Sequence, residues 1–309
     1  MRHHPRVALG CVVAGVLLVS ATRAAEAQST ETIPISRCAP GVHESEARGT
    51  VGFPQDSIHC PLFADPKEPR SFVSLLRGTF RSLDDPSGSG ATIVSVGIGD
   101  AFGLVRWNGA RPGDGVQLDV VGAVFAQFDF EAPSKDLINA DYTIGFPLTL
   151  RKRGFSTRLR LYHQSSHLGD EFLLRDGEIQ RENLSFESFE VLISQELRAF
   201  RVYAGAERLF RREPETVSTS VFHAGVEGRS GRLGPVQLIA ALDMKSPELH
   251  DWSPAMSGRA GIEFVRSGGS GHPARLVTMM FEWYDGPSPY GQFFQDDISY
   301  VGAGVHFSL

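Results

Sequence analysis

The stretch of sequence that decides the fold runs from Val116 to Phe130 and reads VQLDVVGAVFAQFDF. Successive side chains of a β-strand point to opposite faces, so residues two apart share a face. The polar residues of the stretch are Gln117, Asp119, Gln127 and Asp129, and the apolar residues interleaved with them are Leu118, Val120, Val124, Ala126, Phe128 and Phe130. The stretch therefore predicts a long strand with one apolar and one polar face.

The same alternation recurs along the chain from Phe72 onward, without a convincing helical period. Residues 236–245, for example, repeat it with apolar side chains at the even positions. We predict strands at residues 71–83, 91–107, 116–130, 137–150, 155–168, 183–198, 200–211, 217–229, 235–246, 254–266, 273–285 and 296–309. An even number of long alternating segments is typical of a transmembrane antiparallel β-barrel, here of about twelve strands.

The connections between the predicted strands differ in length in a regular way. Those after even-numbered strands are short or glycine-rich, as at 151–154, whereas those after odd-numbered strands include the two longest, 169–182 and 286–295. Outer-membrane barrels have short periplasmic turns and longer outside loops. This pattern favours an all-β barrel in the outer membrane of a Gram-negative bacterium over a soluble β-sandwich, which also alternates.

The chain has a secretory beginning. A basic start, an apolar stretch from Val7 to Ser20 and the small-x-small site 25–27 predict a signal peptide over residues 1–27. Residues 28–70 do not alternate, and we expect them to form an N-terminal periplasmic segment ahead of a barrel at 71–309. Cys38 and Cys60 remain in the exported chain and are expected to form a disulfide. The formal charge of -6, with no long basic run, argues against nucleic acid as a partner.

A histidine and a serine share one face of the predicted strand 155–168. His163 and Ser165 continue the face of Leu159 and Leu161, whereas Arg158 and Arg160 lie on the other face. The arginine face is expected to line the lumen, because an arginine facing the middle of the bilayer costs roughly 2–4 kcal/mol. His163 and Ser165 are then polar groups on the lipid-facing wall near its outer end. A base beside a hydroxyl is the minimum for nucleophilic catalysis.

This His-x-Ser pattern resembles the site of outer-membrane phospholipase A, a twelve-stranded barrel, and is similar to that of the lipid A deacylases. Those families continue with Asn-Gly, where this chain has Ser166-His167. Across most of its exported length, the chain resembles the uncharacterised bacterial family DUF1207, through FADPKEPR at 63–70 and the segment 163–171. The DUF1207 resemblance implies an outer-membrane barrel and no established activity. The His-x-Ser resemblance implies a serine hydrolase that acts on acyl esters of outer-leaflet lipids, with these lipids as its partners.

In that hypothesis Ser165 is the nucleophile and His163 its general base. A hairpin centred near Arg175 places Glu187 opposite His163, so Glu187 is the expected third member, and Asn183 is the alternative because the phospholipase family uses an asparagine. Asp170 and Glu171 could hold calcium at the adjoining loop, or join His163 and His167 around a metal if the strand bends. No other cofactor is expected.

Two features leave other interpretations open. His-x-Ser has only two fixed positions, and strand ends of barrels are generally polar, so the motif by itself is weak. The alternative function is a non-enzymatic barrel, either a narrow pore or an envelope adaptor, whose lumen charged side chains could largely plug.

The C-terminal strand alternates up to Leu309 and resembles the signal that outer-membrane barrels present to the barrel assembly machinery. That machinery and a second copy of the chain, in a homodimer, are the protein partners expected.

Overall fold

A computed structural model describes residues 49–309 except 82–87, 112, 176–182, 232, 266–275 and 308–309. The signal peptide, Cys38 and Leu309, about which the sequence made predictions, lie outside the described residues. In the part of the chain that is described, no helix combines the length and the apolar composition of a membrane-spanning helix.

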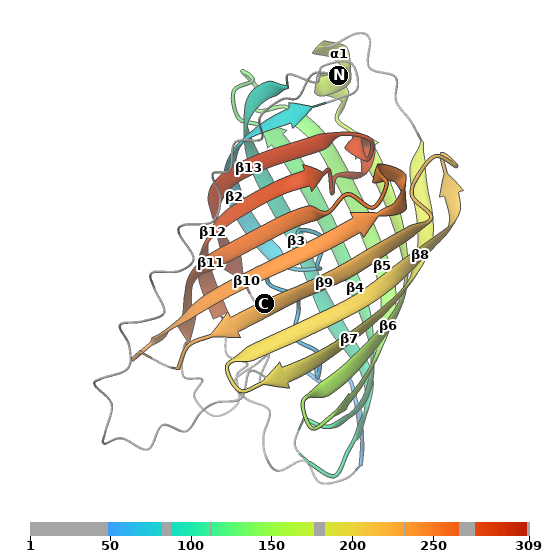
Figure 1. Cartoon of the computed structure of the whole chain (residues 1–309), viewed down its shortest axis with the longest axis vertical. Helices are drawn as coiled ribbons and strands as arrows, with labels where there is room; N and C mark the ends of the chain where they lie inside the picture. Colours follow the sequence, from blue (N-terminus) through green and yellow to red (C-terminus); the bar gives the residue numbers. More distant parts are fainter. Residues whose placement is uncertain are drawn as a thin grey trace, which may run out of the picture. The chain divides into compact units, whose positions relative to one another are not determined.

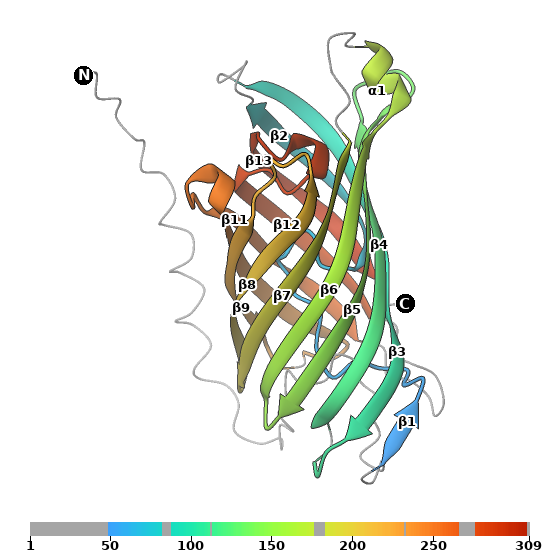
Figure 2. The same ribbon diagram turned by 90° about the vertical axis from the view of Figure 1, so that its right-hand side faces the viewer.

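In the described residues, twelve antiparallel strands close into a barrel (Figures 1 and 2). Each strand pairs with its neighbours in sequence, and β13 pairs with β2 to close the ring. The strands are β2 (Ser71–Arg81), β3 (Ser89–Asn108), β4 (Gly115–Asp129), β5 (Leu137–Lys152), β6 (Phe155–Leu168), β7 (Leu184–Leu197), β8 (Phe200–Glu213), β9 (Ser220–Arg229), β10 (Val236–Pro247), β11 (Ala255–Val265), β12 (Leu276–Pro287) and β13 (Asp297–Phe307). The predicted barrel is confirmed, with strand bounds that differ from the predicted ones by no more than three residues.

The polarity of the barrel is the reverse of that of a soluble protein. Large apolar side chains are exposed on the outside, as Phe146 (52%) and Phe281 (56%) illustrate, whereas Arg201 and Glu227 are buried inside. Only lipid can cover such an outer surface favourably, and a closed barrel leaves no unpaired strand edge within the bilayer. The protein is therefore an outer-membrane barrel rather than a β-sandwich.

The two ends of the barrel differ. Tight turns such as Arg153–Gly154 close one end, which we call the turn end. The other end, the loop end, carries the short helices α1 (Asp170–Arg175), η1 (Glu248–His250) and η2 (Gly291–Phe293), and α1 lies beyond the end of β6 in Figure 2. Short turns are typical of the periplasmic side, so the loop end faces outward.

The described part of the predicted periplasmic segment lies partly at the turn end and partly inside the barrel. Residues 50–52 form β1 (Thr50–Gly52), which pairs with β3 at the turn end. Residues 54–70, which we call the lumen segment, then run through the interior of the barrel, and Leu62 and Ala64 are completely buried there. The prolines at positions 54, 61, 66 and 69 cannot donate to a strand ladder, so the segment fills the lumen without joining the wall.

Candidate functional site on the outer wall

β6 has one buried face and one partly exposed face. Arg158 and Arg160 point inward and are 4% exposed each, whereas His163 and Ser165 belong to the partly exposed outer set. This follows from strand alternation, because all four residues lie on one regular strand. The pair therefore lies on the lipid-facing wall, three to five residues before β6 ends at the loop end.

Glu187 on β7 lies directly opposite His163 in the antiparallel register. The His163 Nδ1 atom is 3.5 Å from the Glu187 Oε1 atom, and both side chains are partly exposed, at 44% and 31%. The predicted register is confirmed by this pairing. A carboxylate beside Nδ1 favours the tautomer that leaves Nε2 free to accept a proton.

Ser165 is adjacent to this pair but not bonded to it. Its register partners are Ser185 on β7 and Tyr142 on β5, and among the described contacts no hydrogen bond joins it to His163. Residues two apart on a strand are about 6.5 Å apart along the backbone, so contact requires the imidazole to turn toward the hydroxyl. Such contacts are often long without substrate and shorten when substrate binds.

A groove of about 650 Å³ runs along the outer wall across β3 to β6, and His163 and Ser165 line it. Gly122 lies on its floor, in the same cross-strand row as His163, with Ile144 between them. The exposed apolar side chains of Ile98 and Phe102 line its far side. A groove with apolar walls and a few polar groups is the shape expected of a binding site for a lipid.

The sequence analysis did not single out Asp100, which also lines this groove. It lies on β3 in phase with Ile98 and Phe102, which are 65% and 56% exposed. A carboxylate on the lipid-facing side of a strand is energetically costly, so its presence there indicates a function. The sequence contains a signal for it: Asp100 is the single acidic residue between Ile98 and Phe102 on the apolar face of the predicted strand.

The remaining predicted site residues lie away from the groove. Asn183 is exposed just before β7, beyond the last register pair with β6, so Glu187 rather than Asn183 faces His163. Asp170 and Glu171 are exposed in the first turn of α1. β6 continues as a strand through Leu168, and His167 packs edge-on against Tyr142. Among the described residues no group of three or more metal-ligating side chains is arranged around one point.

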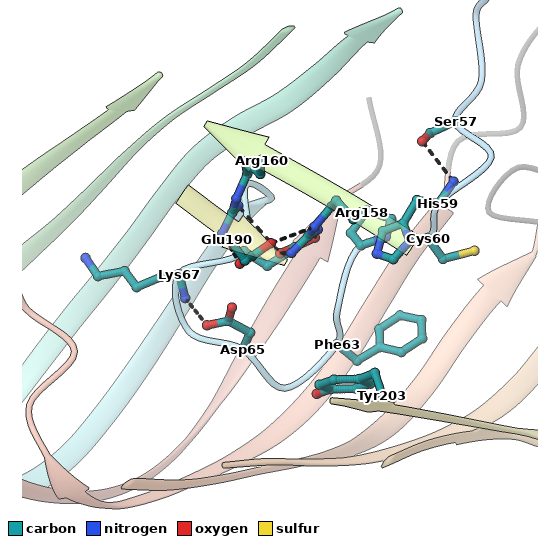
Figure 3. Close-up of polar contacts among 12 residues, drawn as sticks. Ser57, His59, Cys60, Phe63, Asp65, Lys67, Arg158, Arg160, Glu190 and Tyr203 are labelled. Atoms are coloured by element: carbon teal, nitrogen blue, oxygen red, sulfur yellow. Dashed lines mark hydrogen bonds and ion pairs between the residues drawn. The ribbon is translucent and has the colours of Figure 1, made fainter. Parts of the chain in front are cut away.

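Inside the barrel, a buried ion-pair network holds the lumen segment (Figure 3). Glu68 accepts hydrogen bonds from both terminal nitrogens of Arg158, at 2.6 and 3.2 Å. Glu190 on β7 bonds Arg158 at 3.0 Å and Arg160 at 2.7 Å. Two guanidinium groups thus face two carboxylates, and each of these four side chains is no more than 5% exposed.

Further contacts fix the segment along its length. Lys67 bonds Asp141, and Asp65 pairs with Lys245 at 2.9 Å. The backbone is bound as well: Arg201 donates to the Cys60 carbonyl and Arg259 to the Phe63 carbonyl, each at 2.8 Å. Cys60 is disulfide-bonded; Cys38, its predicted partner, lies outside the described residues.

The inward-facing charges that the sequence analysis proposed as filling the lumen do lie in it. Asp119, Arg158, Arg160 and Glu263 are each no more than 4% exposed. With the lumen segment threaded among them, protein occupies the described part of the interior apart from small cavities, unlike the polar, water-filled channel of a porin.

Comparisons with known proteins agree with this fold. The chain belongs to the family "Protein of unknown function (DUF1207)", which matches residues 20–309. No curated protein matches the chain. Among solved structures it is similar to outer membrane phospholipase A from Escherichia coli, with a TM-score of 0.50 and 14% identity over 79% of this chain and 93% of that chain. It is also similar to an active site mutant of the Escherichia coli protein, with a TM-score of 0.50 and 13% identity over 82% and 94%. A calcium-bound dimer of the phospholipase from Salmonella typhi matches at 12% identity over 79% and 94%, with a TM-score of 0.49.

Proposed function

We propose that this member of the DUF1207 family is a serine hydrolase that cleaves acyl esters of outer-leaflet lipids at the outer wall of its barrel. The observation that carries the proposal is the Glu187–His163 pair beside Ser165 on the lipid-facing wall, where His163 and Ser165 line a groove. Polar side chains on a lipid-facing wall are costly, so a cluster of three of them calls for a function. The barrel fold that the chain shares with outer membrane phospholipase A supports the proposal.

The reaction follows from the arrangement of the three side chains. His163 Nε2 takes the proton of the Ser165 hydroxyl as its Oγ attacks the ester carbonyl carbon, which gives a tetrahedral intermediate. When the intermediate collapses, the bond from the carbonyl carbon to the alcohol oxygen breaks, and the imidazolium returns the proton to that oxygen. Water then releases the fatty acid from Ser165 by the same route. Glu187 orients the ring and stabilises its charged form.

The groove supports a lipid substrate in particular. Its apolar walls offer a surface for an acyl chain that remains in the membrane, so the ester can reach Ser165 without leaving the lipid phase. Calcium and a second copy of the chain are further proposed partners of the reaction, by analogy with the calcium-bound phospholipase dimer. Asp170 and Glu171 are the calcium ligands to test.

The competing function, a narrow pore, is disfavoured by the packed interior. The lumen segment and its ion pairs occupy the path that ions would take. An envelope adaptor would not require the outward-facing cluster of His163, Ser165 and Glu187.

The experiment compares fatty-acid release from phospholipid in mixed detergent micelles by the wild type and two serine variants, with calcium or with a chelator. Ser165→Ala is expected to lose turnover. Ser185→Ala is the matched control, because Ser185 is the register partner of Ser165 on the next strand, and it is expected to retain turnover. Equal rates for Ser165→Ala and the wild type, or no release from any lipid together with ion conductance in bilayers, would overturn the proposal.

A further inference from the structure

A second cavity lies inside the barrel, between the turn of the lumen segment at 65–67 and the loop 288–294. Its volume is about 170 Å³. About 150 Å³ of enclosed space is enough for a benzene-sized molecule. The cavity can therefore hold a small organic molecule, and it is separated by the barrel wall from the groove that contains Ser165.

The walls of this cavity are mostly apolar and aromatic. On one side, Leu184, Phe186, Leu209 and Val217 form a buried cluster to which Phe294 adds. On the other side lie the rings of Tyr284 and Tyr290. Such walls favour a ligand with an apolar or aromatic body, because they offer little to a strongly hydrated one.

Most of the charged side chains that face the cavity have a partner of opposite charge or several hydrogen-bond donors. Lys67 is bound to Asp141, and Lys245 is paired with Asp65. Asp243 accepts a hydrogen bond from the Tyr203 hydroxyl and lies 2.6 Å from His223 Nε2.

Glu207 on β8 differs from these groups. It receives hydrogen bonds from two neutral hydroxyls, those of Tyr162 and Ser188, both on the same oxygen, Oε1. Among the described residues, no cationic side chain forms an ion pair with it; Lys245, on the same cavity, interacts with it electrostatically but is paired with Asp65. Its register partner is Glu190, a second carboxylate, whose own charge is balanced by Arg158 and Arg160 and which therefore supplies no cation to Glu207.

From this imbalance we infer that the cavity binds a small organic cation, namely a primary ammonium compound with an apolar or aromatic body. The ammonium group would bind the second oxygen of Glu207, and the body would pack among the apolar walls. An ammonium group beside aromatic rings gains further stabilisation from their faces. The inference concerns the lumen and holds whether or not the outer wall is catalytic.

The test is calorimetric titration of the full-length protein in detergent with 2-phenylethylammonium, compared with the neutral 2-phenylethanol and the anionic phenylacetate. The cation is expected to bind at least tenfold more tightly than either of the other two probes. Glu207→Gln keeps the shape and the acceptor oxygen but removes the charge, so it should abolish the preference for the cation while leaving the weak binding of the alcohol unchanged.

Two more variants locate the site. Val221→Trp should fill the cavity and abolish binding of both the cation and the alcohol. Glu187→Gln removes a carboxylate from the neighbouring strand on the outer wall and should leave binding unchanged. Equal affinity for cation and alcohol, undiminished cation binding by Glu207→Gln, or no binding of the cation at millimolar concentration would each overturn the inference.

Discussion

Removing the charge of Glu68 tests whether the ion pairs hold the lumen segment in the barrel. Arg158, Arg160, Glu68 and Glu190 are balanced, two positive against two negative, and all are buried. In Glu68→Gln two guanidinium groups would share the single carboxylate of Glu190. Removing one partner of a buried pair costs about 3–5 kcal/mol, because the charge left behind is uncompensated. We therefore expect the free energy of unfolding to fall by that amount.

The assay is urea unfolding in lipid vesicles, followed by tryptophan fluorescence. The double variant Glu68→Gln/Arg158→Gln should be more stable than Glu68→Gln alone, because Arg160 and Glu190 then balance each other. Glu131→Gln is the control: its pair with Arg77 is exposed at the rim, and no resolvable change is expected. If Glu68→Gln unfolds like the wild type, or if the double variant is less stable than the single one, the charge balance does not hold the segment.

Three further predictions concern the groove, the lumen and the disulfide. A Cβ at Gly122 would meet no atom closer than 3.9 Å, so Gly122→Val should fold normally, yet lower lipid turnover at least tenfold by filling part of the groove. Unchanged kinetics would show that the groove takes no part in the reaction. The wild type should conduct little current in planar bilayers, whereas a chain lacking residues 54–65 should open measurable channels, and equal currents would show that the segment does not close the lumen. A maleimide should label Cys60 in unfolded protein only after reduction, and labelling beforehand would contradict the disulfide.

The barrel could be read from the sequence because its signal is local and repeated. Alternation along each strand gives both the strand and its lumen face, and a hairpin of known centre gives the register, which placed Glu187 opposite His163 before any coordinates. The inward direction of Arg158 followed from the cost of a charge facing lipid.

The lumen segment could not be read in the same way. Residues 54–70 have no period, and their place depends on contacts with strands far along the chain, such as Glu68 with Arg158 and Asp65 with Lys245. The sequence pattern there indicates only a proline-rich connection and does not indicate its position in the barrel. The cavity beside Glu207 could not be predicted for the same reason, since its walls come from β6 to β12, from the lumen segment and from a distant loop.

The account depends most on Ser165 being a nucleophile on the outer wall. The most direct measurement is the reaction of the purified protein with an acyl-chain sulfonyl fluoride in micelles, followed by peptide mass mapping. We predict one adduct, on Ser165, with none on its neighbour Ser185 and a much slower reaction in His163→Asn. No adduct on Ser165, or equal labelling of Ser165 and Ser185, would contradict the account.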